Sequence, residues 1–210
     1  MKGSLTVLVM FICGCLVGRC WNPDGGAEAG LHEASAYVLY FLMLQVGMSI
    51  GRNKQLRRLL EHFSWRWVLL PLATVGGTLA FSAVIALLLR QWSVFEVLAA
   101  GSGMGYYSLS SILIAQLKMP SLGAQLAAEL STIALLSNVF RELIALIGAP
   151  LFRRFFGKLA PIAVAGVTSV DVALPAIIRT CGQPMAAIAV FHGILIDVSV
   201  PFLVTFFCQF

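Results

Sequence analysis

The chain has 210 residues, of which 60% are apolar and only 11% are charged. Soluble proteins are typically about 45–50% apolar and about 25% charged. With a mean hydropathy of +0.93, this chain lacks the polar surface of a soluble enzyme, a nucleic-acid-binding domain or a disordered protein. Its net charge of +5 is interpreted as the positive charge of cytoplasmic loops in a multi-pass membrane protein, so no nucleic-acid partner is expected.

Apolar stretches recur along the whole chain. A transmembrane helix needs about 20 apolar residues, so the length allows about seven crossings, all within one membrane domain. The stretches cover residues 5–18, 34–51, 67–89, 97–117, 122–150, 161–178 and 185–209. The first one resembles a signal peptide, but Gly14 and Gly18 favour a closely packed membrane helix. The five cysteines form no C-x-x-C pair, so they are interpreted as small apolar side chains without redox chemistry.

Two basic clusters indicate which ends of these stretches face the cytoplasm. They comprise Arg52, Lys54, Arg57, Arg58 and Arg66, and then Arg153, Arg154 and Lys158. If every stretch crossed once, the two clusters would lie on opposite sides of the membrane, although basic residues concentrate on the cytoplasmic side. This predicts that 97–117 is a re-entrant hairpin or a discontinuous helix. The alternative is that one cluster lies outside the cytoplasm.

Two local patterns predict breaks in the helices. The run Gly101-Ser102-Gly103-Met104-Gly105 weakens a helix, and non-helical backbone is tolerated in a membrane only inside protein or along a wet cavity. Asp171, followed by Pro175, interrupts the sixth stretch in the same way. The sequence predicts an all-α polytopic membrane protein of about six or seven segments, with discontinuous or re-entrant helices near 101–108 and 168–175. The alternative for the glycines is a packing face for a neighbouring helix.

Ionisable side chains at membrane depth cost roughly 2.5–3.5 kcal/mol and therefore suggest function. Asn138 and Glu142 are four residues apart and share a helical face, while Arg141 lies on a second polar stripe. A structural ion pair for Arg141, and interhelical hydrogen bonding for Asn138, are the alternatives. Asp171 beside the second break suggests a site for cations or charged substrates, with helix capping as its alternative.

The last stretch contains His192 and Asp197. His192 either relays protons or is a buried core residue. Asp197 lies five residues further on, so it points to another face of the helix. The candidate transport residues are Glu142, Asp171, Asn138, Arg141 and His192, and the candidate broken-helix backbone and lining residues are Gly103, Gly105, Tyr106, Tyr107, Ser108, Ser169 and Pro175.

Enzyme signatures are missing from the sequence. There is no H-E-x-x-H, no G-x-S-x-G and no P-loop, so we expect neither catalysis nor a metal ion or cofactor.

Three stretches together resemble the lysine exporter (LysO) family. They are Gly103-Met104-Gly105-Tyr106-Tyr107-Ser108, Asn138-Val139-Phe140-Arg141-Glu142, and Ser169-Val170-Asp171 continuing to His192-Gly193. The resemblance implies export of L-lysine and its toxic analogue thialysine across the bacterial inner membrane, with proton coupling as in an antiporter. It also implies that Glu142 is the candidate proton carrier and that Asp171 is the acid of a Ser-x-Asp motif.

The chain resembles only the C-terminal half of the usual family member, which has a further N-terminal block of membrane segments. The expected partners are therefore the lipid bilayer, the lysine substrate, and either a second short membrane subunit or a second copy of the chain. From the residues alone, two alternatives stay open. One is a secondary transporter of another small solute, and the other is a membrane subunit without transport of its own.

Overall fold

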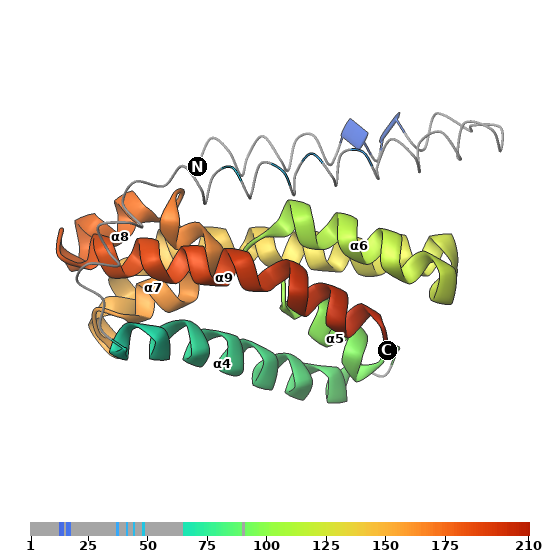
Figure 1. Cartoon of the computed structure of the whole chain (residues 1–210), viewed down its shortest axis with the longest axis horizontal. Helices are drawn as coiled ribbons and strands as arrows, with labels where there is room; N and C mark the ends of the chain where they lie inside the picture. Colours follow the sequence, from blue (N-terminus) through green and yellow to red (C-terminus); the bar gives the residue numbers. More distant parts are fainter. Residues whose placement is uncertain are drawn as a thin grey trace.

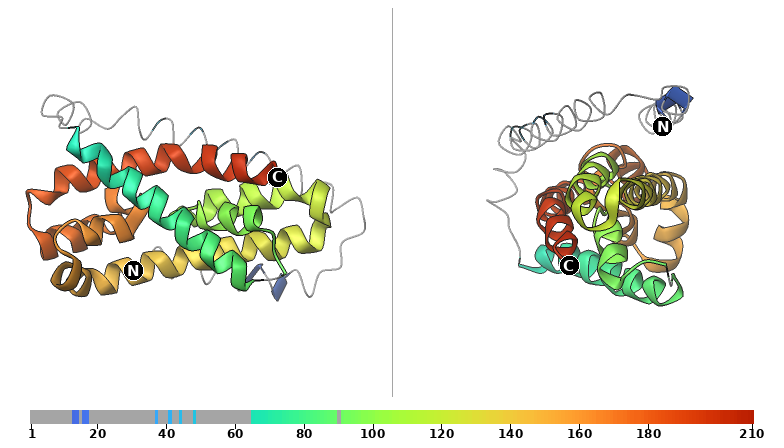
Figure 2. Two further views of the ribbon diagram at one scale, coloured as in Figure 1. Left: turned by 90° about the horizontal axis from the view of Figure 1, so that it is seen from below. Right: turned by 90° about the vertical axis from the view of Figure 1, so that its right-hand side faces the viewer.

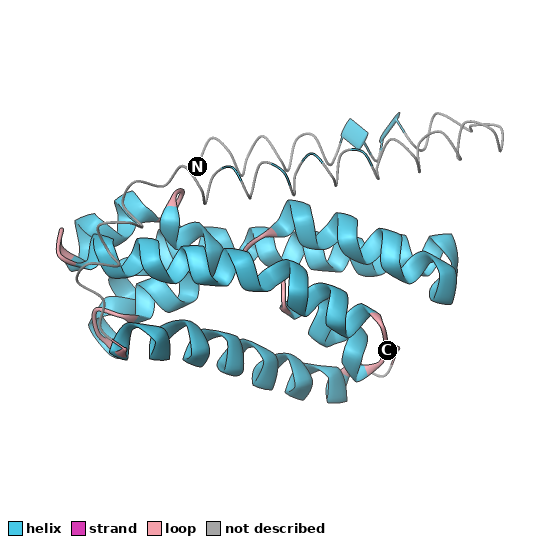
Figure 3. Cartoon of the chain, in the orientation of Figure 1, coloured by secondary structure: helices cyan, strands magenta, loops and turns pink. Residues whose placement is uncertain are grey.

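The computed structural model describes residues 65–89 and 91–210, together with a few isolated residues before position 49. The described part is helical and contains no strand (Figure 3). Its elements are α4 (Arg66–Leu88), α5 (Val94–Gly101), α6 (Tyr107–Phe156), α7 (Ala160–Ala165), the 3₁₀ helix η1 (Gly166–Val170), α8 (Leu174–Cys181) and α9 (Met185–Cys208) (Figure 1). The expected segments 5–18 and 34–51 lie almost wholly outside the described residues.

Three helices are long and apolar enough to cross a membrane: α4 over Trp67–Leu88, α6 over Tyr107–Phe156, and α9 over Met185–Cys208. Large apolar side chains such as Leu72, Phe81 and Leu88 point outward from α4, as expected for a helix that contacts lipid. The predicted fold class, an all-α membrane protein, is confirmed.

The long helix α6 is bent into two arms at Gly123, whose backbone is non-helical (φ 81°, ψ 165°). A straight helix of its 50 residues would be about 75 Å long. Asn138 would then lie far from Gly105, but its Oδ1 accepts a hydrogen bond of 2.7 Å from the Gly105 N–H. The arms 107–122 and 124–156 therefore run back alongside each other, as Figures 1 and 2 show.

The segment α5 and the first arm of α6 form a re-entrant hairpin. The helix α5 starts at the end of the bundle where α4 finishes, breaks at its C-terminus near the middle, and the first arm of α6 returns to the same end (Figure 1). Ser93 and Glu96 form a capping box at the start of α5. A buried ion pair between Glu96 and Lys118, 3.8 Å apart, joins the two limbs. The predicted break near 101–108 is confirmed, and a re-entrant path of 97–117 through the membrane stays a prediction.

A second hairpin enters from the opposite end of the bundle. The second arm of α6 crosses to that end, α7 returns to the middle, η1 interrupts the helix, and α8 leads back to the same end (Figure 1). The helix α9 then crosses the bundle again. The two hairpin tips touch, because the Val167 N–H donates a 3.0 Å hydrogen bond to the Met104 carbonyl. The predicted break near 168–175 is confirmed.

The chain thus contains two similar units, each made of a crossing helix followed by a hairpin. The two units run in opposite directions through the bundle. The first unit consists of α4 with the α5–α6 hairpin, and the second consists of the arm 124–156 with the α7–α8 hairpin. The start of α4 and the end of α6 consequently lie at one end of the bundle (Figures 1 and 2). This arrangement agrees with the even number of crossings that the two basic clusters require.

Candidate functional site

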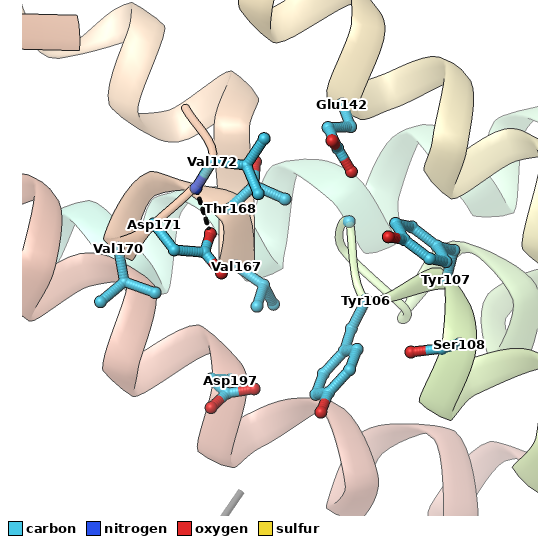
Figure 4. Close-up of a pocket in the computed structure, with 11 residues that line it drawn as sticks. Tyr106, Tyr107, Ser108, Glu142, Val167, Thr168, Val170, Asp171, Val172 and Asp197 are labelled. Atoms are coloured by element: carbon cyan, nitrogen blue, oxygen red, sulfur yellow. Dashed lines mark hydrogen bonds between the residues drawn. The ribbon is translucent and has the colours of Figure 1, made fainter. Parts of the chain in front are cut away.

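A cavity of about 260 Å³ lies where the two hairpin tips meet (Figure 4). It is lined by Gly105, Tyr106, Tyr107, Ser108, Glu142, Val167, Thr168, Val170, Asp171, Val172 and Asp197. The lining therefore contains three carboxylates, and among the residues that the structure describes no lysine, arginine or histidine belongs to it. Most of the candidate residues from the first break line the cavity, together with Glu142 and Asp171.

The backbone of the first break is held in an unusual conformation. Met104 and Gly105 both have positive φ angles, of 45° and 98°. Asn138 supports this backbone from behind, because its Oδ1 accepts from the Gly105 N–H and its Nδ2 donates to Ala134 O at 2.7 Å and Ala100 O at 3.3 Å. Asn138 thus braces the break and does not line the cavity. Beyond the break, Tyr107 and Ser108 at the start of α6 line the cavity, and the first N–H groups of a helix have no acceptor within it.

The second break depends on Gly166 and on short side-chain hydrogen bonds. Gly166 has a φ of 63°, and a Cβ atom there would collide with the Met104 carbonyl oxygen. The Thr168 hydroxyl donates to Ala165 O at 2.9 Å. Ser169 Oγ lies within hydrogen-bond distance of Gly166 O and Ala189 O. These bonds fix the turn that carries Asp171, whose carboxylate accepts from the Val172 N–H (Figure 4).

The three acids reach the cavity from three different elements. Glu142 comes from the second arm of α6 and is only 1% exposed, Asp171 comes from the turn after η1, and Asp197 comes from α9 (Figure 4). All three carboxylates line this one cavity. Because like charges repel strongly where water is scarce, this group of acids attracts cations.

His192 lies behind the second break. It is fully buried, with Nδ1 3.1 Å from Ser169 Oγ and Nε2 3.0 Å from Thr74 Oγ1. The ring therefore joins α9 to η1 and to α4, and it does not belong to the cavity lining. A role for His192 in relaying protons stays a prediction. Gly103, whose Cβ would meet Asn138 and Ser110, also lies behind the cavity.

Arg141 lies away from the three acids. Its Nε donates to Val164 O at 2.9 Å, and its terminal nitrogens donate to Ala163 O and Thr78 Oγ1, both at 3.2 Å. It lines a shallow apolar groove that α4 shares with α6 and α7. Pro175 sits in the first turn of α8, outside the cavity lining. The sequence groups Arg141 with Glu142, and Pro175 with Asp171, but neither Arg141 nor Pro175 lines the cavity.

Asp197 is the ionisable lining residue that the sequence-based candidates omitted. Its separation of five residues from His192 does place it on another face of α9, but the cavity lies on the Asp197 face. The cost of an acid inside an apolar helix was the available signal, and it applied to Asp197 as much as to Glu142.

A model of the lysine exporter LysO family matches residues 8–208. This chain belongs to the lysine exporter LysO family. It is 31% identical over 176 residues to the lysine exporter LysO of Escherichia coli. The aligned region covers 83% of this chain and 55% of that protein. It is 27% identical over 181 residues to a putative lysine exporter of Haemophilus influenzae. That alignment covers 84% of this chain and 85% of the relative.

The chain therefore spans about half the length of the Escherichia coli LysO protein and most of the Haemophilus influenzae one. No solved structure gives a significant match. Family membership and the apolar helices together identify the chain as a membrane protein of the LysO family, as the three sequence motifs predicted.

Proposed function

We propose that this chain exports L-lysine and analogues such as thialysine across the bacterial inner membrane, in exchange for protons. The observation that carries the proposal is the cavity at the two hairpin tips, where the described residues present three carboxylates and no cationic side chain. Such a cavity suits a substrate with a net positive charge. The relatives described as lysine exporters support lysine as that substrate.

The cavity offers partners for each charged group of lysine. Glu142, Asp171 and Asp197 can accept charge-assisted hydrogen bonds from the two ammonium groups. The first turn of α6 can receive the substrate carboxylate, because its N–H groups and the helix dipole favour an anion there. Tyr106 and Tyr107 line the same space and can pack along the methylene chain or face an ammonium group.

Proton exchange is proposed because acids inside a membrane protein commonly form proton pathways in transporters, and three acids line this cavity. A carboxylate can bind either a proton or an ammonium group, so lysine and protons would compete for the same side chains. Glu142, almost fully buried on a crossing helix, is the proposed main proton carrier.

Two units of opposite direction around a central site are typical of carriers that open alternately to the two sides of the membrane. The longer Escherichia coli relative contains further chain that this one does not match. We therefore propose that the working carrier also includes a second short membrane subunit or a second copy of this chain.

The experiment is thialysine resistance and lysine efflux in a bacterial host that lacks its own exporter. The chain is expressed alone and together with the product of the neighbouring membrane reading frame. Resistance from the chain alone indicates a self-sufficient assembly of copies, and resistance only with the partner indicates a split carrier. If neither confers resistance while both proteins are in the membrane, the lysine assignment is wrong, and another solute or a non-transporting subunit remains.

Glu142→Gln should reduce lysine efflux by at least about tenfold, because a charge-assisted hydrogen bond of about 1.5–3 kcal/mol is lost. Glu129→Gln is the matched control, since Glu129 lies on the same arm of α6 but lines a different surface hollow. Unchanged efflux from Glu142→Gln would remove the proposed proton carrier.

A further inference from the structure

Asp197 reaches the cavity from α9, which belongs to neither hairpin. Figure 4 shows its carboxylate near the ring of Tyr106, on the α9 side of the cavity. Asp171 also lines this cavity and lies on the same side of it as Asp197 (Figure 4). The fold thus brings the two acids to one side of the cavity, although 26 residues separate them in sequence (197 − 171).

Glu142 occupies the other side of the same cavity. It extends from the second arm of α6 toward Tyr107 (Figure 4). Asp171 and Asp197 instead come from the turn after η1 and from α9. The lining therefore has two acidic parts, one formed by Asp171 and Asp197 and the other by Glu142. In the same view Tyr106 lies beside Asp197, and Tyr107 lies on the side of Glu142.

A pair of neighbouring carboxylates is a suitable receptor for one ammonium group. Such a group has three donors, so it can bond to both acids at once and relieve their repulsion. A single carboxylate can hold a second ammonium group, but only if the substrate is long enough to reach both parts. A substrate with one ammonium group leaves one acidic part without a cation.

We infer that Asp197, paired with Asp171, determines specificity by binding one ammonium group while Glu142 binds the other. The site then selects molecules that carry two ammonium groups separated by a methylene chain. This inference rests on the proposed function, because it deepens the role of the same cavity.

The test is competition against labelled lysine in proteoliposomes that contain the full chain, with its partner subunit if export requires one. The competitors are ornithine and cadaverine, which have two ammonium groups, and norleucine, which has one. For the unaltered protein we expect both diamines to compete and norleucine to be about 10- to 100-fold weaker, because one charge-assisted site stays empty. Norleucine equal to lysine would overturn the inference without any variant.

The carboxylate of norleucine would bind at the first turn of α6, so its adjacent ammonium group would bind Glu142, which lies on the Tyr107 side. In the Asp197→Asn variant, the apparent affinity for lysine should therefore fall by about 10- to 100-fold, while that for norleucine changes little. The advantage of lysine over norleucine should therefore shrink. Asp197→Glu, which keeps the charge, should restore most of the advantage of lysine over norleucine. Ser199→Ala, on the same helix, is the control. A lysine-to-norleucine ratio that is unchanged in Asp197→Asn overturns the inference, even though lysine export stands. Absence of lysine transport by the unaltered protein would instead reject the proposed function.

Discussion

At the scale of single residues, polar side chains inside this bundle divide into two groups. Glu142, Asp171 and Asp197 line the cavity. Asn138 and Arg141 instead bond to backbone groups near the two breaks. The reason is that a broken helix leaves N–H and C=O groups without helical partners, and buried backbone groups must be paired. Polar side chains that do not line the cavity therefore stabilise the breaks by bonding to their backbone groups.

Arg141 provides a test of this division. Arg141→Lys keeps the charge but removes the planar fork that donates to both Val164 O and Ala163 O. We expect the free energy of unfolding of the purified protein in detergent to fall by about 1–3 kcal/mol. Thermal unfolding measures this change, with the exposed Arg179→Lys as the control. The preference for lysine over norleucine should stay unaltered, and a changed preference would indicate that Arg141 acts on the substrate.

At the scale of elements, the function of the two hairpins depends on how closely their tips approach. Val167 donates to Met104 across the contact, and Gly166 leaves no room for a side chain there. The Gly193 position on α9 is similarly tight, since a Cβ would lie 2.7 Å from the Val170 nitrogen. The tips are therefore packed backbone against backbone, and the cavity opens beside this contact.

Gly166→Ala should abolish lysine efflux, because a methyl group would meet the Met104 carbonyl and separate the tips. Gly157→Ala is a closely matched control. Gly157 also has a positive φ, of 88°, but nothing lies within 4 Å of its Cβ position. The control should therefore cost only about 1 kcal/mol of backbone strain and retain efflux. Equal efflux from the two variants, measured at equal amounts in the membrane, would contradict the role assigned to the tip contact.

At the scale of the whole molecule, the two units of opposite direction determine which loops share a side of the membrane. The α5–α6 hairpin begins and ends at one end of the bundle, and the α7–α8 hairpin begins and ends at the other (Figures 1 and 2). An ordinary crossing of 97–117 would separate the two ends of the first hairpin. Labelling from one side of the membrane distinguishes these topologies.

For this test, single cysteines replace Gln91, Ser121, Lys158 or Gln183 in a cysteine-free variant, since all four side chains are exposed. A maleimide that cannot cross the membrane should label positions 91 and 121 from one side and positions 158 and 183 from the other. Labelling of 91 and 121 from opposite sides would exclude the re-entrant hairpin. Because basic residues favour the cytoplasm, positions 158 and 183 should be the cytoplasmic pair.

Much of the architecture was predictable from the sequence, because it depends on local composition. Runs of apolar residues predict helices, and the glycines at 101, 103 and 105 and the Asp171–Pro175 segment predict the breaks. The basic clusters require an even number of crossings between them. The cost of a buried acid marked Glu142 and Asp171. Each of these inferences uses only neighbours along the chain.

The role of each polar side chain was decided by the tertiary structure. Asn138, Arg141 and Glu142 lie within one helical turn, yet Glu142 faces the cavity, Asn138 braces the first break and Arg141 faces α4 and α7. Asp197 and His192 share α9, but only Asp197 lines the cavity. Helical spacing shows which residues share a face, whereas the packing of distant segments decides what each face meets. Sequence alone therefore determined a membrane bundle with two broken helices, and only the fold determined which acids converge.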